Sequence, residues 1–146
     1  METPMITRSA LLVCAMTMFV APVSAQEFEL TPSPEGASVR FISPADGATV
    51  TSPVLVVFGL SGMGVAPAGF DITGTGHHHL ILNRELPPMT DVIPASQQSL
   101  HFGGGQTETT LELEPGTHTL QLLFGDYRHI PHDPPLVSEQ ITITVE

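Results

Sequence analysis

Two short segments of the chain, residues 76–82 and 125–135, hold most of the side chains that could do chemistry. Their histidines are His77, His78, His79, His129 and His132. Neutral imidazole is the commonest metal ligand in proteins, and it suits zinc, copper, nickel and iron. The two segments therefore predict a metal site, provided that the fold brings them together.

The elements expected to position these histidines are strands. Alternating or β-branched apolar runs predict strands, proline and glycine clusters predict the turns between them, and no segment has helical periodicity. The expected strands are residues 38–42, 54–60, 77–82, 99–102, 107–113, 117–124 and 137–145, with a short edge segment at 49–50. About seven such strands predict an all-β fold, an immunoglobulin-like antiparallel β-sandwich; a small open barrel is the alternative.

Antiparallel order would place the loops after the second, fourth and sixth long strands at one end of the sandwich. These are the loops 61–76, 103–105 and 125–135, and the loops after the second and sixth strands jointly form binding surfaces in such folds. Six of the seven histidines fall at this end, including His101 beside the glycines 103–105. His118 falls at the opposite end, where we expect a corner residue bonded to the backbone.

Side chains alternate between the two faces of a strand. His78 shares a face with Leu80 and Leu82, so we expect it to cap the core as a hydrogen-bonded histidine. His77 and His79 are expected to face outward.

The predicted ligands are His77, His79, His129, His132, His101 and His78, and the expected ion is copper or zinc. Asp71, Asp126 and Asp133 could orient these rings or supply oxygen ligands. Met63 could act as a soft ligand for Cu(I) or simply pack in its loop. Because no regular metal-binding spacing occurs, a hydrogen-bonded histidine network and a pH sensor are open alternatives.

The first 25 residues are typical of a secretory signal peptide, with an apolar run at 10–20 and small residues before a cleavage position after Ala25. The run is shorter than the roughly 20 residues of a membrane span, so no membrane insertion is expected after cleavage. We therefore expect residues 1–25 to be a signal peptide, 26–37 a flexible spacer, and 38–146 the folded domain of a periplasmic or secreted protein. The single cysteine, Cys14, lies in the signal, so the expected mature chain has no disulfide and no thiolate ligand.

The charge is strongly acidic, with a formal net charge of −11 and no lysine. Binding to phosphate needs lysine or arginine, so nucleic acid is a poor partner, and divalent or soft metal cations are better ones. Plain solubility of an acidic exported protein also accounts for this charge.

No reaction is indicated by the motifs. The nucleophile pattern Gly-x-Ser-x-Gly is absent, and the glycines 103–105 are followed by neither a helix nor a lysine. We therefore expect a non-enzymatic protein that carries or buffers a metal. The alternatives are an interaction module for an envelope protein or a glycan, and a hydrolase whose metal activates water.

Seven motifs between about Val39 and Val145 are similar to those of a bacterial exported family called domain of unknown function 4399. They are Ile42-Ser-Pro-Ala-Asp-Gly47, Gly62-Met-Gly-Val-Ala-Pro67, Gly76-His-His-His-Leu80, Leu86-Pro-Pro88, His101-Phe-Gly-Gly-Gly-Gln-Thr107, His118-Thr-Leu-Gln-Leu122 and Gly125-Asp-Tyr-Arg-His-Ile-Pro-His132. The resemblance implies an exported single-domain protein and supplies no established activity. The absence of lysine is the one departure.

Overall fold

The structure is a computed structural model that describes residues 29–146 as ten strands, with no helix in that range. The strands are β1 (Ser38–Ser43), β2 (Thr49–Val50), β3 (Val54–Ser61), β4 (Gly64–Val65), β5 (Thr75–Leu82), β6 (Ser99–His101), β7 (Glu108–Leu111), β8 (Gly116–Gly125), β9 (Pro131–Val137) and β10 (Ile141–Val145). Residues 29–146 contain no helix that could span a membrane. The predicted signal peptide, residues 1–25, lies outside the described part of the chain.

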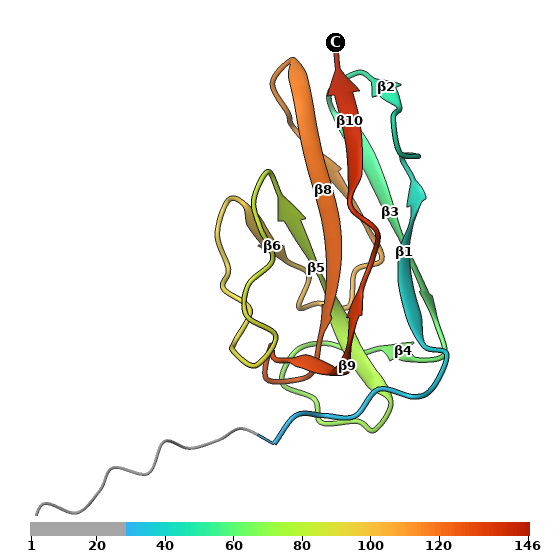
Figure 1. Ribbon diagram of the computed structural model, residues 1–146, viewed down its shortest axis with the longest axis vertical. Coiled ribbons are helices and arrows are strands. Elements are labelled where there is room, and N and C mark those ends of the chain that lie inside the picture. Colours follow the sequence, from blue (N-terminus) through green and yellow to red (C-terminus); the bar gives the residue numbers. More distant parts are fainter. Residues whose placement is uncertain (1–28) are drawn as a thin grey trace, which may run out of the picture.

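The strands form two sheets that face each other (Figure 1). One sheet has the order β1-β3-β7, and the other has the order β2-β10-β8-β5-β4, with β6 paired to β5 and β9 paired to β8. The all-β antiparallel sandwich predicted from sequence is confirmed. In one detail the strand order is distinctive, because β6 pairs with β5, whereas the corresponding strand of a constant-type immunoglobulin domain lies in the opposite sheet.

The main core fills the space between the sheets. Alternation puts Val54, Val56 and Phe58 of β3 on the inner face of one sheet and Leu122 and Phe124 of β8 on the inner face of the other, all at most 4% exposed. Large apolar side chains of this kind stabilise a fold by roughly 1.5–3 kcal/mol each when fully buried.

A smaller apolar cluster covers the outer face of the larger sheet. It consists of Ile81 on β5, Leu123 on β8 and Ile93, which comes from the long loop 83–98. Loop 83–98 is thus packed onto the outer face of this sheet, over β5 and β8. Long loops in compact domains often carry function, and here the loop shields part of a strand that would otherwise face solvent.

One expectation about the strands differs from the structure. The strand predicted at 137–145 is two strands, because β9 begins at Pro131 and ends at Val137, and Ser138 then bonds to β8 before β10 begins. Within the predicted spacer, 26–37, residues 32 and 33 lie beside Asp133. Pro32 forms a parallel bridge with Asp133, and the Ser33 amide donates to the Asp133 carbonyl at 3.0 Å.

Candidate metal centre

Strand pairing fixes which face each histidine of β5 occupies. His77, His78 and His79 are opposite Gly125, Phe124 and Leu123 of β8, and His79 is also opposite His101 of β6. Directly paired residues of neighbouring strands project to the same face of a sheet. His79 and His101 therefore share the outer face with His77, and His78 projects into the sandwich with Phe124.

His129 reaches the same place from the turn between β8 and β9. Its amide donates to the Asp126 carbonyl at 2.9 Å, and the Asp126 amide donates to the Ile130 carbonyl at 2.8 Å. His129 itself has a left-handed backbone, with φ of 68°, which histidine adopts more readily than most residues with a side chain. The His129 carbonyl accepts the Ile93 amide at 2.7 Å, so the covering loop is fastened to this turn.

The Asp126 side chain holds the turn from inside. Its Oδ1 accepts the amides of Arg128 and Ile130 at 2.8 and 3.0 Å, and its Oδ2 accepts Thr31 and Arg128 side chains. Burial alone would raise the pKa of Asp126, but these hydrogen bonds outweigh it and hold the pKa below its usual value. The carboxylate is therefore ionised at neutral pH and keeps His129 beside the sheet.

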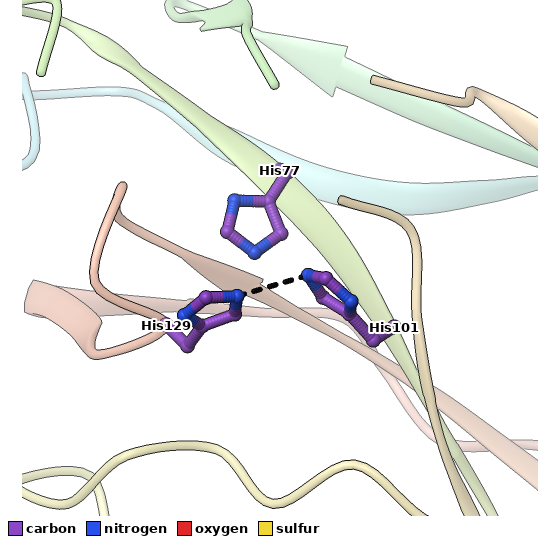
Figure 2. Close-up of side chains that lie close together, drawn as sticks. All are labelled: His77, His101 and His129. Atoms are coloured by element: carbon purple, nitrogen blue, oxygen red, sulfur yellow. Dashed lines mark hydrogen bonds between the residues drawn. The ribbon is translucent and has the colours of Figure 1, made fainter. Parts of the chain in front are cut away.

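The four rings on the outer face form one cluster. Nε2 of His79 lies 3.0 Å from Nε2 of His77, and Nε2 of His129 lies 3.1 Å from Nε2 of His101. Ring nitrogens of His77, His101 and His129 all lie within 4.8 Å of one another, and Figure 2 shows these three rings turned toward a common point. The ring centroids of His79 and His101 are 5.1 Å apart. Four imidazoles from β5, β6 and the β8–β9 turn thus meet although they span 53 positions of sequence, from 77 to 129.

The two buried rings of the cluster, His77 and His79, are electrically neutral at physiological pH in the folded protein. Burial, followed by repulsion from the neighbouring histidines, lowers the pKa of His77 to about 4 and that of His79 to about 2. Burial and the nearby His129 also lower the pKa of His101. A metal ion requires neutral imidazole, and burial keeps His77 and His79 in that form.

The cluster has dimensions that suit a small metal ion. Zinc bonds to imidazole nitrogen at about 2.0–2.1 Å, which places two nitrogens of a tetrahedral site about 3.3–3.4 Å apart. The two short nitrogen–nitrogen separations, 3.0 and 3.1 Å, are a few tenths of an ångström smaller. His77 and His79 are fully buried, whereas His101 is exposed and His129 is half-buried, so one side of the cluster is open to solvent.

Two predicted ligands lie elsewhere, on the inner face of the sheet. The His78 ring contacts Phe58 and Phe124 at centroid distances of 5.0 Å, and the His132 ring stacks on Phe124 at 5.8 Å. His132 was expected beside His129, but β9 begins at Pro131 and directs His132 into the sandwich. His78 caps the core as expected, yet neither of its ring nitrogens has a hydrogen-bond partner in the described residues.

The burial of His77 and His79 also differs from expectation. Both face away from the main core, as the alternation predicted, but they are fully buried and do not face solvent. The His129 ring from the β8–β9 turn lies against both of them, and the loop that carries Ile93 is bonded to that turn.

The remaining candidates from the sequence take other positions. His118 bonds to Asn83 and to the Glu114 carbonyl, which agrees with a corner residue. Met63 packs against the main core, Asp71 is exposed, and Asp133 is exposed and pairs through its backbone with residues 31–33. Among the three aspartates considered, only Asp126 holds a segment that carries a clustered ring.

Two glycines make room for the rings. A Cβ on Gly103 would overlap Cε1 of His101, and a Cβ on Gly125 would lie 3.2 Å from Nε2 of His79. Substitution at Gly103 would therefore displace the flexible end of His101 itself.

Sequence reasoning missed Thr31 and Arg128, which contact Asp126 and not the rings. The Thr31 hydroxyl donates to Asp126 Oδ2 at 2.7 Å, and the Arg128 guanidinium donates to the same oxygen at 3.0 Å. The salt link raises the pKa of Arg128. The adjacency of Asp126 and Arg128 on one turn was a usable local signal, but nothing local connects Thr31 with a residue 95 positions away.

A family model described as Domain of unknown function (DUF4399) matches residues 56–146, which is more than half of the chain. The chain belongs to the DUF4399 family. All four clustered histidines lie within the matched part, whereas Thr31 and β1 precede it. No curated protein and no solved structure matches this DUF4399 chain.

Proposed function

We propose that this chain is an exported, non-enzymatic protein that binds one copper or zinc ion through His77, His79, His101 and His129 and carries or buffers it. The observation that supports the proposal most strongly is the meeting of four imidazoles from three separate segments, with Nε2 atoms paired at 3.0 and 3.1 Å. Imidazole nitrogens are suitable ligands for both ions, and the ring pair on β5 is held by a buried central strand.

The chemistry of the surroundings favours a cation. The hydrogen bonds of the four rings within residues 29–146 run only to one another, and no basic side chain takes part in them. The net charge of −11 would attract a cation at long range. Periplasmic or secreted placement follows from the signal peptide expected at residues 1–25.

Calorimetric titration of residues 26–146 with Cu(II) and with Zn(II) at pH 7 tests the proposal. We expect stoichiometric binding that is lost in the double variant His101→Ala/His129→Asn. The matched control is His118→Ala, which removes a histidine from the opposite end of the sandwich and should leave affinity unchanged. Equal affinity of wild type and double variant would refute the site.

A second candidate function is a protein- or glycan-interaction module without a metal. Exposed Phe70, Ile72 and Val92 favour it, because each lies in a loop fastened to the turn that carries His129. The Gly69 amide donates to the Tyr127 carbonyl, and the Ile93 amide donates to the His129 carbonyl. If the same titration shows no metal binding tighter than micromolar, this candidate is favoured.

A further inference from the structure

The segment Glu29–Ser33 crosses the turn that carries His129 and is hydrogen-bonded to its base. The Asp133 amide donates to the Thr31 carbonyl at 3.0 Å, and the Ser33 amide donates to the Asp133 carbonyl at 3.0 Å. Arg128 Nη2 donates to the Glu29 carbonyl at 2.8 Å. Through these contacts the segment becomes an added edge beside β9.

Asp126 is the point where this segment and the turn meet. Its Oδ1 is occupied by the two amides of the turn, those of Arg128 and Ile130. Its Oδ2 is occupied by the Thr31 hydroxyl and the Arg128 guanidinium. The carboxylate is 1% exposed, so water has little access to replace a lost partner.

We propose that Thr31 is a positioning residue for His129, and that the contact between Thr31 and Asp126 sets the affinity of the histidine cluster for its ion. The affinity part rests on the proposed function. Residues hydrogen-bonded to a metal-ligating side chain typically change metal affinity by about 10–100-fold when they are replaced. Thr31 reaches the turn that carries His129 only through Asp126. We therefore expect an effect near the lower limit, about tenfold.

The physical reason is the entropy of the turn. His129 is the one clustered ring that comes from a turn between strands, and its left-handed backbone depends on the hydrogen bonds that Asp126 makes. Without the Thr31 hydroxyl, Oδ2 retains only Arg128, whose side chain is 30% exposed. The carboxylate could then rotate, the amides of Arg128 and Ile130 would lose their acceptor part of the time, and the ion would have to order the turn on binding.

Thr31→Val tests the inference, because valine keeps the shape of threonine and removes only the hydroxyl. Ser33→Ala is the matched control: Ser33 lies in the same segment, is equally half-buried, and also donates a 2.7 Å hydrogen bond, but to the Pro134 carbonyl. Thr31→Ser should restore the wild-type behaviour. Amide hydrogen exchange at Arg128, His129 and Ile130 is measured without metal, and Cu(II) and Zn(II) affinities are then measured by calorimetry.

We expect Thr31→Val to exchange these three amides about tenfold faster and to bind the ion about tenfold more weakly, with Ser33→Ala unchanged in both. Equal exchange in the two variants would overturn the positioning role. Faster exchange with unchanged affinity would overturn the link to the ion. If the wild type binds neither metal, the proposed function and the affinity claim both fail, and the exchange rates alone decide whether Thr31 positions the turn.

Discussion

Nε2 of His79 lies 3.0 Å from Nε2 of His77, and both rings are fully buried on the outer face of β5. One of the two nitrogens donates its proton to the other, so the pair has a single proton between its facing atoms. Charging the accepting ring would place a second proton in this gap, and charging the donating ring would place a proton on its Nδ1, which is buried without a partner in the described residues. The pair is thus stable only while both rings are neutral.

The first prediction concerns acid stability. Burial lowers the pKa values of His77 and His78 to about 4 and that of His79 to about 2, whereas the unfolded chain has the ordinary value of 6.5. Below pH 6.5 these histidines bind protons in the unfolded state but not in the folded state. The free energy of unfolding is therefore largest above pH 6.5 and falls as the pH falls toward 4. At pH 5 the loss should be about 1–2 kcal/mol per histidine, measured by urea denaturation at pH 7.5 and pH 5.

The control is the pH range in which these histidines should not change the free energy of unfolding. These three histidines are neutral in both states above pH 7.5, so they should add no slope between pH 7.5 and pH 8.5. Equal free energies of unfolding at pH 7.5 and pH 5 would contradict the burial of the rings.

The second prediction separates the two faces of β5. His79→Leu should abolish tight metal binding, whereas His78→Leu should leave it unchanged, because His78 projects into the core between Phe58 and Phe124. His78→Leu should also leave stability at pH 7 equal or raise it by about 1 kcal/mol, since it removes two buried ring nitrogens without partners. Calorimetry and urea denaturation measure the two effects, and loss of binding in His78→Leu would show that the faces are assigned wrongly.

The third prediction compares His129 with His132, three positions apart. His129→Asn should weaken binding by at least about tenfold while keeping the left-handed backbone, which asparagine tolerates. His132→Leu should not change the affinity, because its ring stacks on Phe124 inside the sandwich. Titration of both variants with Zn(II) distinguishes them, and a dependence on His132 would argue against this placement of β9.

The fourth prediction uses the glycines that follow β6. Gly103→Ala should weaken metal binding, because the added Cβ overlaps the ring of His101 and the ring must swing away. Folding should change by less than about 1 kcal/mol, since the displaced group is the end of an exposed side chain. Gly104→Ala is the control, because its Cβ meets only the side chain of Gln106 at 3.2 Å. If calorimetry gives equal metal affinities for the two variants, the His101 ring is not a ligand.

Local patterns in the sequence predicted the fold and most of the histidine cluster. The alternation from His77 to Leu82 placed His78 opposite to His77 and His79, and the reversal of successive strands brought His101 and His129 to the end where His77 lies. Both inferences use periodicity and chain direction, which depend on neighbouring residues alone.

Long-range contacts explain what the sequence did not reveal. Pro131, Pro134 and Pro135 lack amide hydrogens, which favoured a loop at 125–135, yet β9 begins at Pro131 and turns His132 inward. The covering of this face involves Ile93, which packs on Ile81 and Leu123 and donates to the His129 carbonyl, and the fixation of the turn involves Thr31. Neither contact leaves a periodic signal, because each joins a loop or terminal segment to a distant part of the chain.

The unequal exposure of the four rings has a consequence for how an ion would be released. His77 and His79 are built into the central strand β5, whereas His101 ends the three-residue strand β6 and is exposed. For the proposed ion, an acceptor molecule could replace His101 first and His129 second, while the two buried rings still hold the ion. Residence time would then be governed by stepwise ligand exchange at the surface and would not require the sandwich to open.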